Sequence, residues 1–241
     1  MAELGHALIT GANSGIGKEV ARQLLAEGFV VHVGARDAAR GQAAVDELGP
    51  GARMLVLDVT DEKSIAAAAE HVDQLDILVN NAGISDAGHR APDLDADTLR
   101  RVYETNVFGV VAVTNAFLPV LRHSARPRIV NVSSGTGSLG WSTGPNPQFD
   151  FRLGGGAAAA YRSSKTALNA LTVYYAQALA DDNIKVNALA PGLRATNLNP
   201  RAAELGEDPA EAATGVVRLA LLPPDGPTGT FFSWDGTVAP W

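Results

Sequence analysis

The stretch Thr10-Gly11-Ala12-Asn13-Ser14-Gly15-Ile16-Gly17 joins an apolar run at residues 4–10 to residues 15–27, where apolar side chains recur at helical spacing. Glycines in such a turn permit a tight bend and let a ligand approach the backbone. The helix that follows offers free N–H groups and a positive dipole end, which suit the pyrophosphate of a dinucleotide. The stretch therefore predicts a strand, a phosphate-binding turn and a helix at the start of an α/β domain.

Two other interpretations of this stretch are weaker. A nucleoside-triphosphate loop needs Gly, four residues, Gly-Lys and then Ser or Thr. Gly17-Lys18 fits, but Ala12 stands where the first glycine belongs and Glu19 where the magnesium-binding hydroxyl belongs. A glycine-rich turn without any ligand stays open on this motif alone, because short glycine patterns have many false matches.

The rest of the chain alternates between short apolar runs and segments of helical periodicity. Strands are predicted at 4–10, 29–34, 54–57, 77–79, 128–132, 184–189 and 229–232, and helices at 15–27, 37–48, 60–74, 95–122, 157–180 and 209–222. This alternation predicts one doubly wound Rossmann domain over residues 1–241, a seven-stranded parallel sheet with helices on both faces. Residues 135–160, rich in glycine and interrupted by two prolines, are predicted to form an extended loop.

Composition excludes several classes of function. The 241 residues include 19 Lys and Arg against 26 Asp and Glu, a net charge of −7, whereas non-specific nucleic-acid binding depends on basic patches. The chain has no cysteine, which excludes thiolate sites, and its five histidines show no metal-ligand spacing. No apolar stretch approaches a membrane span, and the acidic start is unlike a signal peptide. We expect a cytoplasmic protein with no metal, membrane or nucleic-acid partner.

The end of the second predicted strand indicates which dinucleotide is bound. An acidic residue there favours the ribose hydroxyls of NAD, whereas an arginine suits the 2′-phosphate of NADP. Arg36 is placed for a phosphate, and Arg40 one helical turn later can assist it. Asp37 either reads the ribose or caps the next helix. We favour NADPH/NADP over NAD.

Tyr161 and Lys165 stand four residues apart on a predicted helix and so share a face. An adjacent ammonium stabilises a phenolate and lowers the pKa of the tyrosine, which makes the pair a candidate proton donor to a carbonyl oxygen. By spacing alone, a solvated helix face is the better interpretation, because this spacing is common by chance.

Together these motifs are similar to those of the short-chain dehydrogenase/reductase family. The resemblance covers nearly the whole chain and rests on residues 10–17, Asp58-Val59, Asn80-Asn81-Ala82-Gly83, Asn106, Asn131-Val132-Ser133-Ser134, Tyr161 with Lys165, and Pro191-Gly192. Within the family the chain is similar to the NADPH-dependent carbonyl reductases, in residues 35–45 and in the tail 219–241.

The resemblance implies a role for each matching residue. Tyr161 would be the general acid in the reduction of a ketone, aldehyde or quinone; Lys165 would lower its pKa and hold the nicotinamide ribose. Ser134 would polarise the substrate carbonyl, and Asn106 would position a water beside Lys165. The implied catalytic residues are Asn106, Ser134, Tyr161 and Lys165. The implied cofactor-binding residues are Gly11, Asn13, Ser14, Gly15, Ile16, Gly17, Arg36, Arg40, Asp58, Val59, Asn81, Ala82, Gly83, Tyr161, Lys165, Pro191, Gly192 and Thr196.

Several alternatives stay open at this stage. Ser133 could replace Ser134 as the active hydroxyl, and Asn106 could be a satisfied polar residue of its helix. The rival functions are an NAD-dependent alcohol or hydroxysteroid dehydrogenase working oxidatively, and a dinucleotide sensor without catalysis. Arg152, Arg194 and Arg201 are candidates to meet an anionic substrate, against the simpler expectation that loop arginines are solvated. Ser134 and Tyr161 stand 27 positions apart, longer than in most of the family. The loop between them either shapes the substrate pocket or only packs its own aromatic side chains down. Carbonyl reductases carry an insertion here that covers a helix face which other members use for dimers, so monomer and homo-oligomer both stay open.

Overall fold

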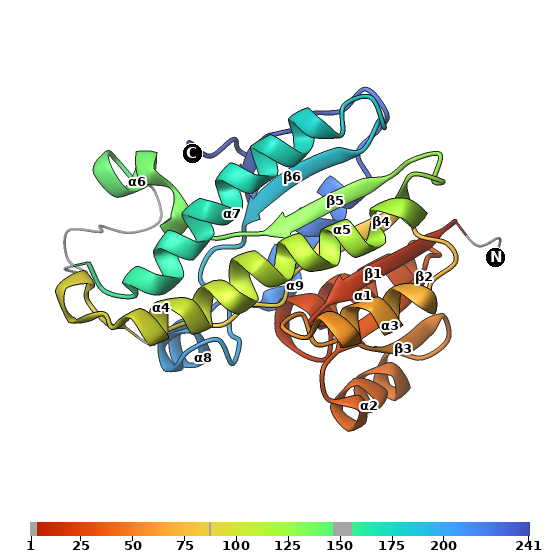
Figure 1. The fold of residues 1–241 in the computed structure, drawn as a ribbon, viewed down its shortest axis with the longest axis horizontal. Helices are drawn as coiled ribbons and strands as arrows, with labels where there is room; N and C mark the ends of the chain where they lie inside the picture. Colours follow the sequence, from red (N-terminus) through yellow and green to blue (C-terminus); the bar gives the residue numbers. More distant parts are fainter. Residues whose placement is uncertain (1–3, 87, 147–155) are drawn as a thin grey trace.

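The computed structural model describes residues 4–86, 88–146 and 156–241, apart from the side chain of Arg201. Its strands form one sheet in the order β3-β2-β1-β4-β5-β6-β7, with parallel neighbours throughout (Figure 1). They are β1 (His6–Thr10), β2 (Val30–Ala35), β3 (Ala52–Val56), β4 (Ile77–Asn80), β5 (Arg128–Val132), β6 (Lys185–Ala190) and β7 (Phe231–Ser233). The predicted doubly wound domain with a seven-stranded parallel sheet is confirmed. The strand order reverses between β1 and β4, and open α/β sheets bind ligands at such a switch point.

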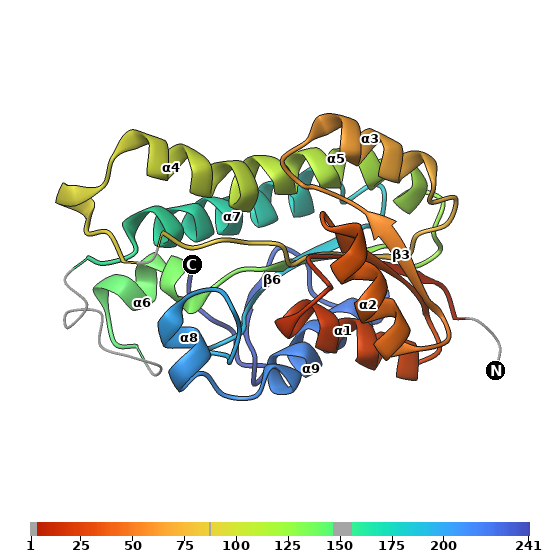
Figure 2. The ribbon, with the colours of Figure 1, turned by 90° about the horizontal axis from the view of Figure 1, so that it is seen from below.

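Helices cover both faces of the sheet (Figure 2). On one face lie α1 (Gly15–Ala26), α2 (Ala38–Leu48) and α9 (Pro209–Ala220), and on the other α3 (Glu62–Glu70), α4 (Ala96–Tyr103), α5 (Gly109–Leu121) and α7 (Ala159–Ala178). The shorter helices are η1 (Ala91–Asp93), η2 (Glu104–Phe108), η3 (Gly135–Gly137), α6 (Leu139–Thr143) and α8 (Pro200–Leu205). The two layers bury both faces of the sheet, as the apolar strand sequences require.

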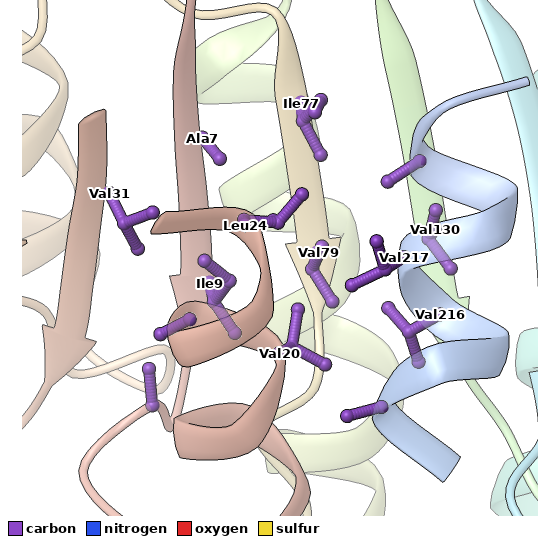
Figure 3. Close-up of a cluster of buried hydrophobic side chains, with 14 of the residues drawn as sticks. Ala7, Ile9, Val20, Leu24, Val31, Ile77, Val79, Val130, Val216 and Val217 are labelled. Carbon is purple, nitrogen blue, oxygen red and sulfur yellow. The ribbon is translucent and has the colours of Figure 1, made fainter. Parts of the chain in front are cut away.

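The strands alternate their side chains between the two helical layers. Ala7 and Ile9 of β1 pack with Leu24 of α1 in one cluster, which α9 completes (Figure 3). Leu8 points the other way, into a second cluster with Phe117 of α5. All five of these side chains are fully buried, and burial of a side chain of Leu or Phe size contributes about 1.5–3 kcal/mol. This packing makes the sheet a rigid support for the loops at its carboxyl edge.

The helix predicted over 95–122 is interrupted by one π-helical turn. Helix α4 runs into η2, a π-helix over Glu104–Phe108, and then into α5. Such turns recur at functional sites in other proteins, and this one carries Asn106. In the described part of the chain, the run Ala96–Leu121 is the one helix long and apolar enough to span a membrane; half of its most apolar window is buried within the protein, as in a core helix.

The predicted loop 135–160 is more ordered at its start than the sequence suggests. It begins with η3 and α6, and Ser138 caps α6 by accepting a hydrogen bond from the N–H of Trp141 (3.0 Å). Trp141 is buried and its ring lies 6.3 Å from that of Phe231 in β7. Burial of this indole against the end of the sheet accounts for the extra helix. Residues 147–155 of the loop lie outside the described part of the chain.

Candidate active site

A cavity of about 460 Å³ opens at the carboxyl ends of β1 and β4, within the size range of small-molecule sites. Most of the predicted site residues meet there. Those that line it are Gly11, Asn13, Ser14, Gly15, Ile16, Arg36, Arg40, Asp58, Val59, Asn81, Ala82, Gly83, Tyr161, Lys165, Pro191 and Thr196. The cavity is also lined by Ser133, the sequence alternative to Ser134, and by eight residues that the sequence did not assign to the site: Ala35, Leu57, Thr60, Ile84, Thr105, Val132, Asn197 and Leu198. All eight lie within one or two positions of predicted residues, so extending each motif by that much would have found them.

The phosphate-binding turn leaves the start of α1 open toward this cavity. Ser14 is the N-cap residue of α1, but its side chain makes no capping hydrogen bond. The starts of α2, α3, α4, α8 and α9 are capped by Asp37, Asp61, Asp95, Asn199 and Asp208. The first N–H groups of a helix need partners, and a phosphate would supply them at α1.

Two polar side chains hold the turn in place, one of them buried. The hydroxyl of Thr10 accepts hydrogen bonds from the N–H groups of Asn81 and Ala82, both at 3.0 Å. The amide of Asn81 donates to the carbonyl oxygens of Thr10 (2.9 Å) and Gly11 (3.2 Å). The ends of β1 and β4 are therefore joined directly, and Asn81 acts on the shape of the turn as well as lining the cavity.

Gly17 and Gly192 do not line the cavity, and each has a packing reason to be glycine. A Cβ on Gly17 would lie 2.7 Å from the carbonyl oxygen of Gly11, so a side chain would push α1 off the turn. This matches the role of the third glycine of a dinucleotide-binding turn, which is close helix packing. Gly192 has φ +75° beside the ring of Trp234, a conformation that L side chains rarely adopt.

The end of β2 presents arginine, not a free carboxylate, to the cavity. Arg36 is exposed and lines it. The side chain of Asp37 accepts a hydrogen bond from the N–H of Arg40 (3.0 Å) and so caps α2. The guanidinium of Arg40 lies 3.8 Å from the Asp37 carboxylate and is also exposed. Of the two roles predicted for Asp37, binding the ribose or capping the next helix, the structure therefore shows the cap.

Tyr161 and Lys165 lie one turn apart on α7 with both side chains at the cavity. The Lys165 ammonium lies 5.7 Å from the centre of the Tyr161 ring and donates a hydrogen bond to the carbonyl oxygen of Val132 at 2.8 Å. Burial lowers the pKa of Lys165 to about 8. Burial also raises the pKa of Tyr161 to about 12, and the hydrogen bond with Ser134 opposes that rise.

The expected lowering of the Tyr161 pKa by Lys165 is therefore wrong for this structure. The spacing of four residues brings the two groups together, but it does not reveal how little water reaches them. Loss of water penalises both charged forms, the phenolate and the ammonium, and this desolvation is the largest cause of both pKa shifts. Near neutral pH, Tyr161 is a protonated phenol beside a Lys165 that is still mostly cationic.

The two serines at the end of β5 have different partners. Ser133 is buried, and its hydroxyl donates to Asn169 on α7 at 2.6 Å. Ser134 shares a hydrogen bond with the Thr136 hydroxyl (2.9 Å) and hydrogen-bonds the side chain of Tyr161. Ser133 thus ties the strand to the helix, whereas Ser134 is the serine linked to the tyrosine hydroxyl.

Asn106 lies behind the cavity wall and its side chain is fully engaged. Its Oδ1 accepts from the N–H of Ile84 (2.9 Å), and its Nδ2 donates to the carbonyl oxygen of Ile84 (2.9 Å) and to the hydroxyl of Ser164 (3.0 Å). Asn106 is wholly buried. It therefore fastens the loop after β4 to α7, as the satisfied polar residue that the sequence left as an alternative.

Arg194 turns inward, away from any role in meeting substrate. Its guanidinium pairs with Glu207 (3.0 Å) and Glu211 (2.7 Å) and lies 4.5 Å from the centre of the Trp234 ring. The neighbouring backbone pairs across the same stem, since the N–H of Ala195 donates to the carbonyl oxygen of Glu207 at 2.7 Å. These contacts fix the base of the segment that carries Thr196, Asn197 and Leu198, three residues that line the cavity. Arg152 and the side chain of Arg201 lie outside the described part of the chain.

The residues present fit a nicotinamide dinucleotide. The open start of α1 suits the pyrophosphate, and Arg36 suits a phosphate at the outer end. At the inner end, Tyr161 and Lys165 line the same cavity as the open start of α1, so a ligand whose phosphates bind at α1 can extend toward them. Within the described residues, no cluster of His, Cys, Asp and Glu could hold a metal ion.

The fold and this cavity define a dinucleotide-binding protein of the Rossmann class, and comparison with known proteins gives its family. The sequence model described as short chain dehydrogenase matches residues 5–146 and 151–205. Salutaridine reductase from Papaver bracteatum is 34% identical, with 94% of this chain and 93% of the relative covered. The chain belongs to the short-chain dehydrogenase/reductase family of oxidoreductases.

Two solved structures are similar throughout. An NADPH-bound carbonyl reductase from chicken fatty liver is 30% identical, with a TM-score of 0.84 over 100% of both chains. A 3-ketoacyl-(acyl-carrier-protein) reductase from Brucella melitensis complexed with NADH is 26% identical with a TM-score of 0.82, over 96% of each chain. Both bind a nicotinamide dinucleotide, one of them the phosphorylated form.

Proposed function

We propose that this protein reduces the carbonyl group of a small ketone, aldehyde or quinone with NADPH, using Tyr161 as the general acid. The observation that carries the proposal is the convergence of Tyr161, Lys165 and the phosphate-binding turn on one cavity of about 460 Å³. The names of two similar proteins, a carbonyl reductase and salutaridine reductase, support reduction as the direction.

The cofactor, when bound, supplies the hydride, and this chain's residues supply geometry and the proton. Tyr161 holds its proton over the whole physiological range, because burial raises its pKa to about 12. It can therefore donate that proton to a carbonyl oxygen as negative charge develops there. Ser134, whose hydrogen bond with Tyr161 opposes the rise of the tyrosine pKa, would donate to the same oxygen.

Lys165 supplies a positive charge next to the phenolate that forms. Its pKa of about 8 leaves it mostly protonated at neutral pH. Val132 holds the ammonium through its carbonyl oxygen, so the charge is fixed close to Tyr161 before the reaction starts. Asn106 acts through Ile84 and Ser164 and fixes the position of α7 against the loop after β4.

The preference for NADPH over NADH rests on the end of β2. Arg36 is exposed at the cavity, where a planar guanidinium can bind a phosphate. Asp37 is occupied as the cap of α2, which removes the acidic partner that a ribose 2′-hydroxyl would need. The rival function is that of an NAD-dependent dehydrogenase working oxidatively. The similar structure complexed with NADH supports only the cofactor of that rival, since it too is a reductase by name.

The test is turnover by purified protein with NADPH and a panel of ketones, aldehydes and quinones. Loss of NADPH absorbance is expected with at least one apolar carbonyl compound and should be slower with NADH. A matched assay supplies NAD with secondary alcohols. Faster oxidation of alcohols with NAD would establish the rival, and failure to bind either cofactor would refute the proposal.

A further inference from the structure

The helix that carries Tyr161 begins without a cap of its own. Its N-cap residue, Ala158, has φ 54° and ψ 41° and offers no side-chain acceptor. Tyr161 stands in the first turn, where the N–H groups have no partner within the helix. The position of Tyr161 therefore depends on whatever satisfies those groups.

The loop after β4 supplies all three partners. The carbonyl oxygen of His89 accepts from the N–H of Ala159 at 3.1 Å. The two carboxylate oxygens of Asp86 accept from the N–H groups of Ala160 and Tyr161, both at 3.3 Å. Asp86 is 3% exposed, so its charge faces the positive end of the helix with little water to screen it.

The loop is held at both ends of this contact. His89 turns its ring back to the carbonyl oxygen of Asp86, with Nδ1 at 2.8 Å. Asn106 grips Ile84 through both backbone groups and reaches Ser164 on α7. The hydroxyl of Ser164 donates to the carbonyl oxygen of Tyr161 at 2.7 Å. The backbone of Tyr161 is therefore fixed through its N–H by Asp86 and through its carbonyl oxygen by Ser164.

We propose that Asp86 is a positioning residue for Tyr161: by capping α7 from the loop that also lines the cofactor cavity, it sets the distance from the tyrosine hydroxyl to the reacting carbonyl. This inference rests on the proposed function and adds to it a residue outside the motifs. Asp86 does not itself line the cavity, and its hydrogen bonds to α7 go to backbone N–H groups of the first turn, including that of Tyr161. The rest of α7 is anchored separately by buried residues such as Leu168 and Thr172, so loss of the cap is local.

The experiment compares Asp86→Ala and Asp86→Asn with Asp95→Ala in the full-length protein. Asp95 caps α4 in the same way, accepting from the N–H of Thr98 at 2.7 Å, and it has no contact with Tyr161. For each variant kcat, the KM of the carbonyl substrate, the Kd of NADPH and the thermal midpoint are measured. Hydrogen exchange of the first turn of α7 is measured alongside, because it reports on the cap without any need for turnover.

Asp86→Ala is expected to lower kcat about 10- to 100-fold, the effect of displacing a reacting group by a fraction of its working distance. The Kd of NADPH should stay near the wild-type value, and exchange of the first turn of α7 should become faster. Asp86→Asn keeps one acceptor oxygen and should recover much of kcat. Asp95→Ala should lose a similar amount of stability and keep kcat.

The inference is overturned if Asp86→Ala keeps the wild-type kcat, whether or not exchange becomes faster. It is also overturned if Asp95→Ala and Asp86→Ala lose kcat in equal proportion to their loss of stability. If Asp86→Ala does not fold, Asp86→Leu, which is close to aspartate in size and also lacks an acceptor, is judged by the same criteria. Wild-type turnover tests the proposed function by itself: without it, the proposed function fails. Unchanged exchange of the first turn of α7 in the variant without an acceptor would refute the cap separately.

Discussion

The pH dependence of reduction follows from the buried ammonium of Lys165. Its pKa of about 8 means that a rise of pH above 8 removes the charge that stabilises the developing phenolate of Tyr161. One pH unit above the pKa, about one molecule in eleven keeps the ammonium, so kcat/KM should fall about tenfold per unit. Tyr161 does not cause this loss, because its own pKa is about 12. No histidine lines the cavity as described.

The assay follows NADPH absorbance with saturating ketone and gives kcat/KM for NADPH from about pH 6.5 to about pH 9.5, since this ratio reports ionisations of the free enzyme. The control is Lys165→Arg, whose guanidinium stays charged over this range. The variant should lose the break near pH 8, whatever its absolute rate. A wild-type profile that is flat to the upper limit would contradict the account, as would a break that persists in Lys165→Arg.

Three further predictions concern cofactor choice and stability. Arg36→Ala should weaken NADPH about tenfold, the low end for an exposed charged hydrogen bond, and leave NADH unchanged in fluorescence titrations; equal losses would refute the phosphate assignment. Converting Glu207 and Glu211 together to Gln should lower the free energy of unfolding in urea by about 3–5 kcal/mol, because the charge of Arg194 stays buried without a carboxylate partner. Arg194→Met should cost less, because the side chains of Glu207 and Glu211 are 69% and 53% exposed and can be solvated by water. A larger loss of stability in Arg194→Met than in the double variant would contradict this. Burial and the nearby His6 lower the pKa of His32 to about 4, so below pH 6.5 the unfolded chain binds a proton that the native state does not. The free energy of unfolding should fall by about 3 kcal/mol between pH 6.5 and pH 4, and His32→Asn should remove most of that slope; a slope that persists in the variant would contradict the assignment.

Most of the fold could be predicted because both faces of the sheet are buried. Strands such as β1 and β4 then read as short continuous apolar runs, and each is followed by a turn with its own polar signature. The cavity lining followed from the same logic, since parallel strands bring their carboxyl ends to one edge. Residues from six separate motifs meet there, as expected.

What the sequence could not predict depends on contacts between distant residues. The π-turn at Asn106 is held by hydrogen bonds to Ile84 and Ser164, and no local pattern announces them. Arg194 was predicted as a candidate for substrate binding, but in the structure it pairs with Glu207 and Glu211, which stand 13 and 17 positions further along the chain.

The predicted direction of the Tyr161 pKa shift was wrong for a related reason. Spacing gives the nearness of Lys165, whereas burial depends on the whole wall of the cavity. The same limit hid Asp86, whose capping partners Ala160 and Tyr161 lie more than seventy positions further along the chain.

The central claim is that the hydroxyl of Tyr161 gives the proton to the reduced carbonyl. Tyr161→Phe tests it most directly, because the change removes that hydroxyl and keeps the ring beside Lys165. With NADPH and an accepted ketone, the account predicts an unchanged Kd for NADPH and a fall in kcat of about 10²–10⁴-fold. A variant that binds NADPH and keeps the wild-type kcat would contradict it.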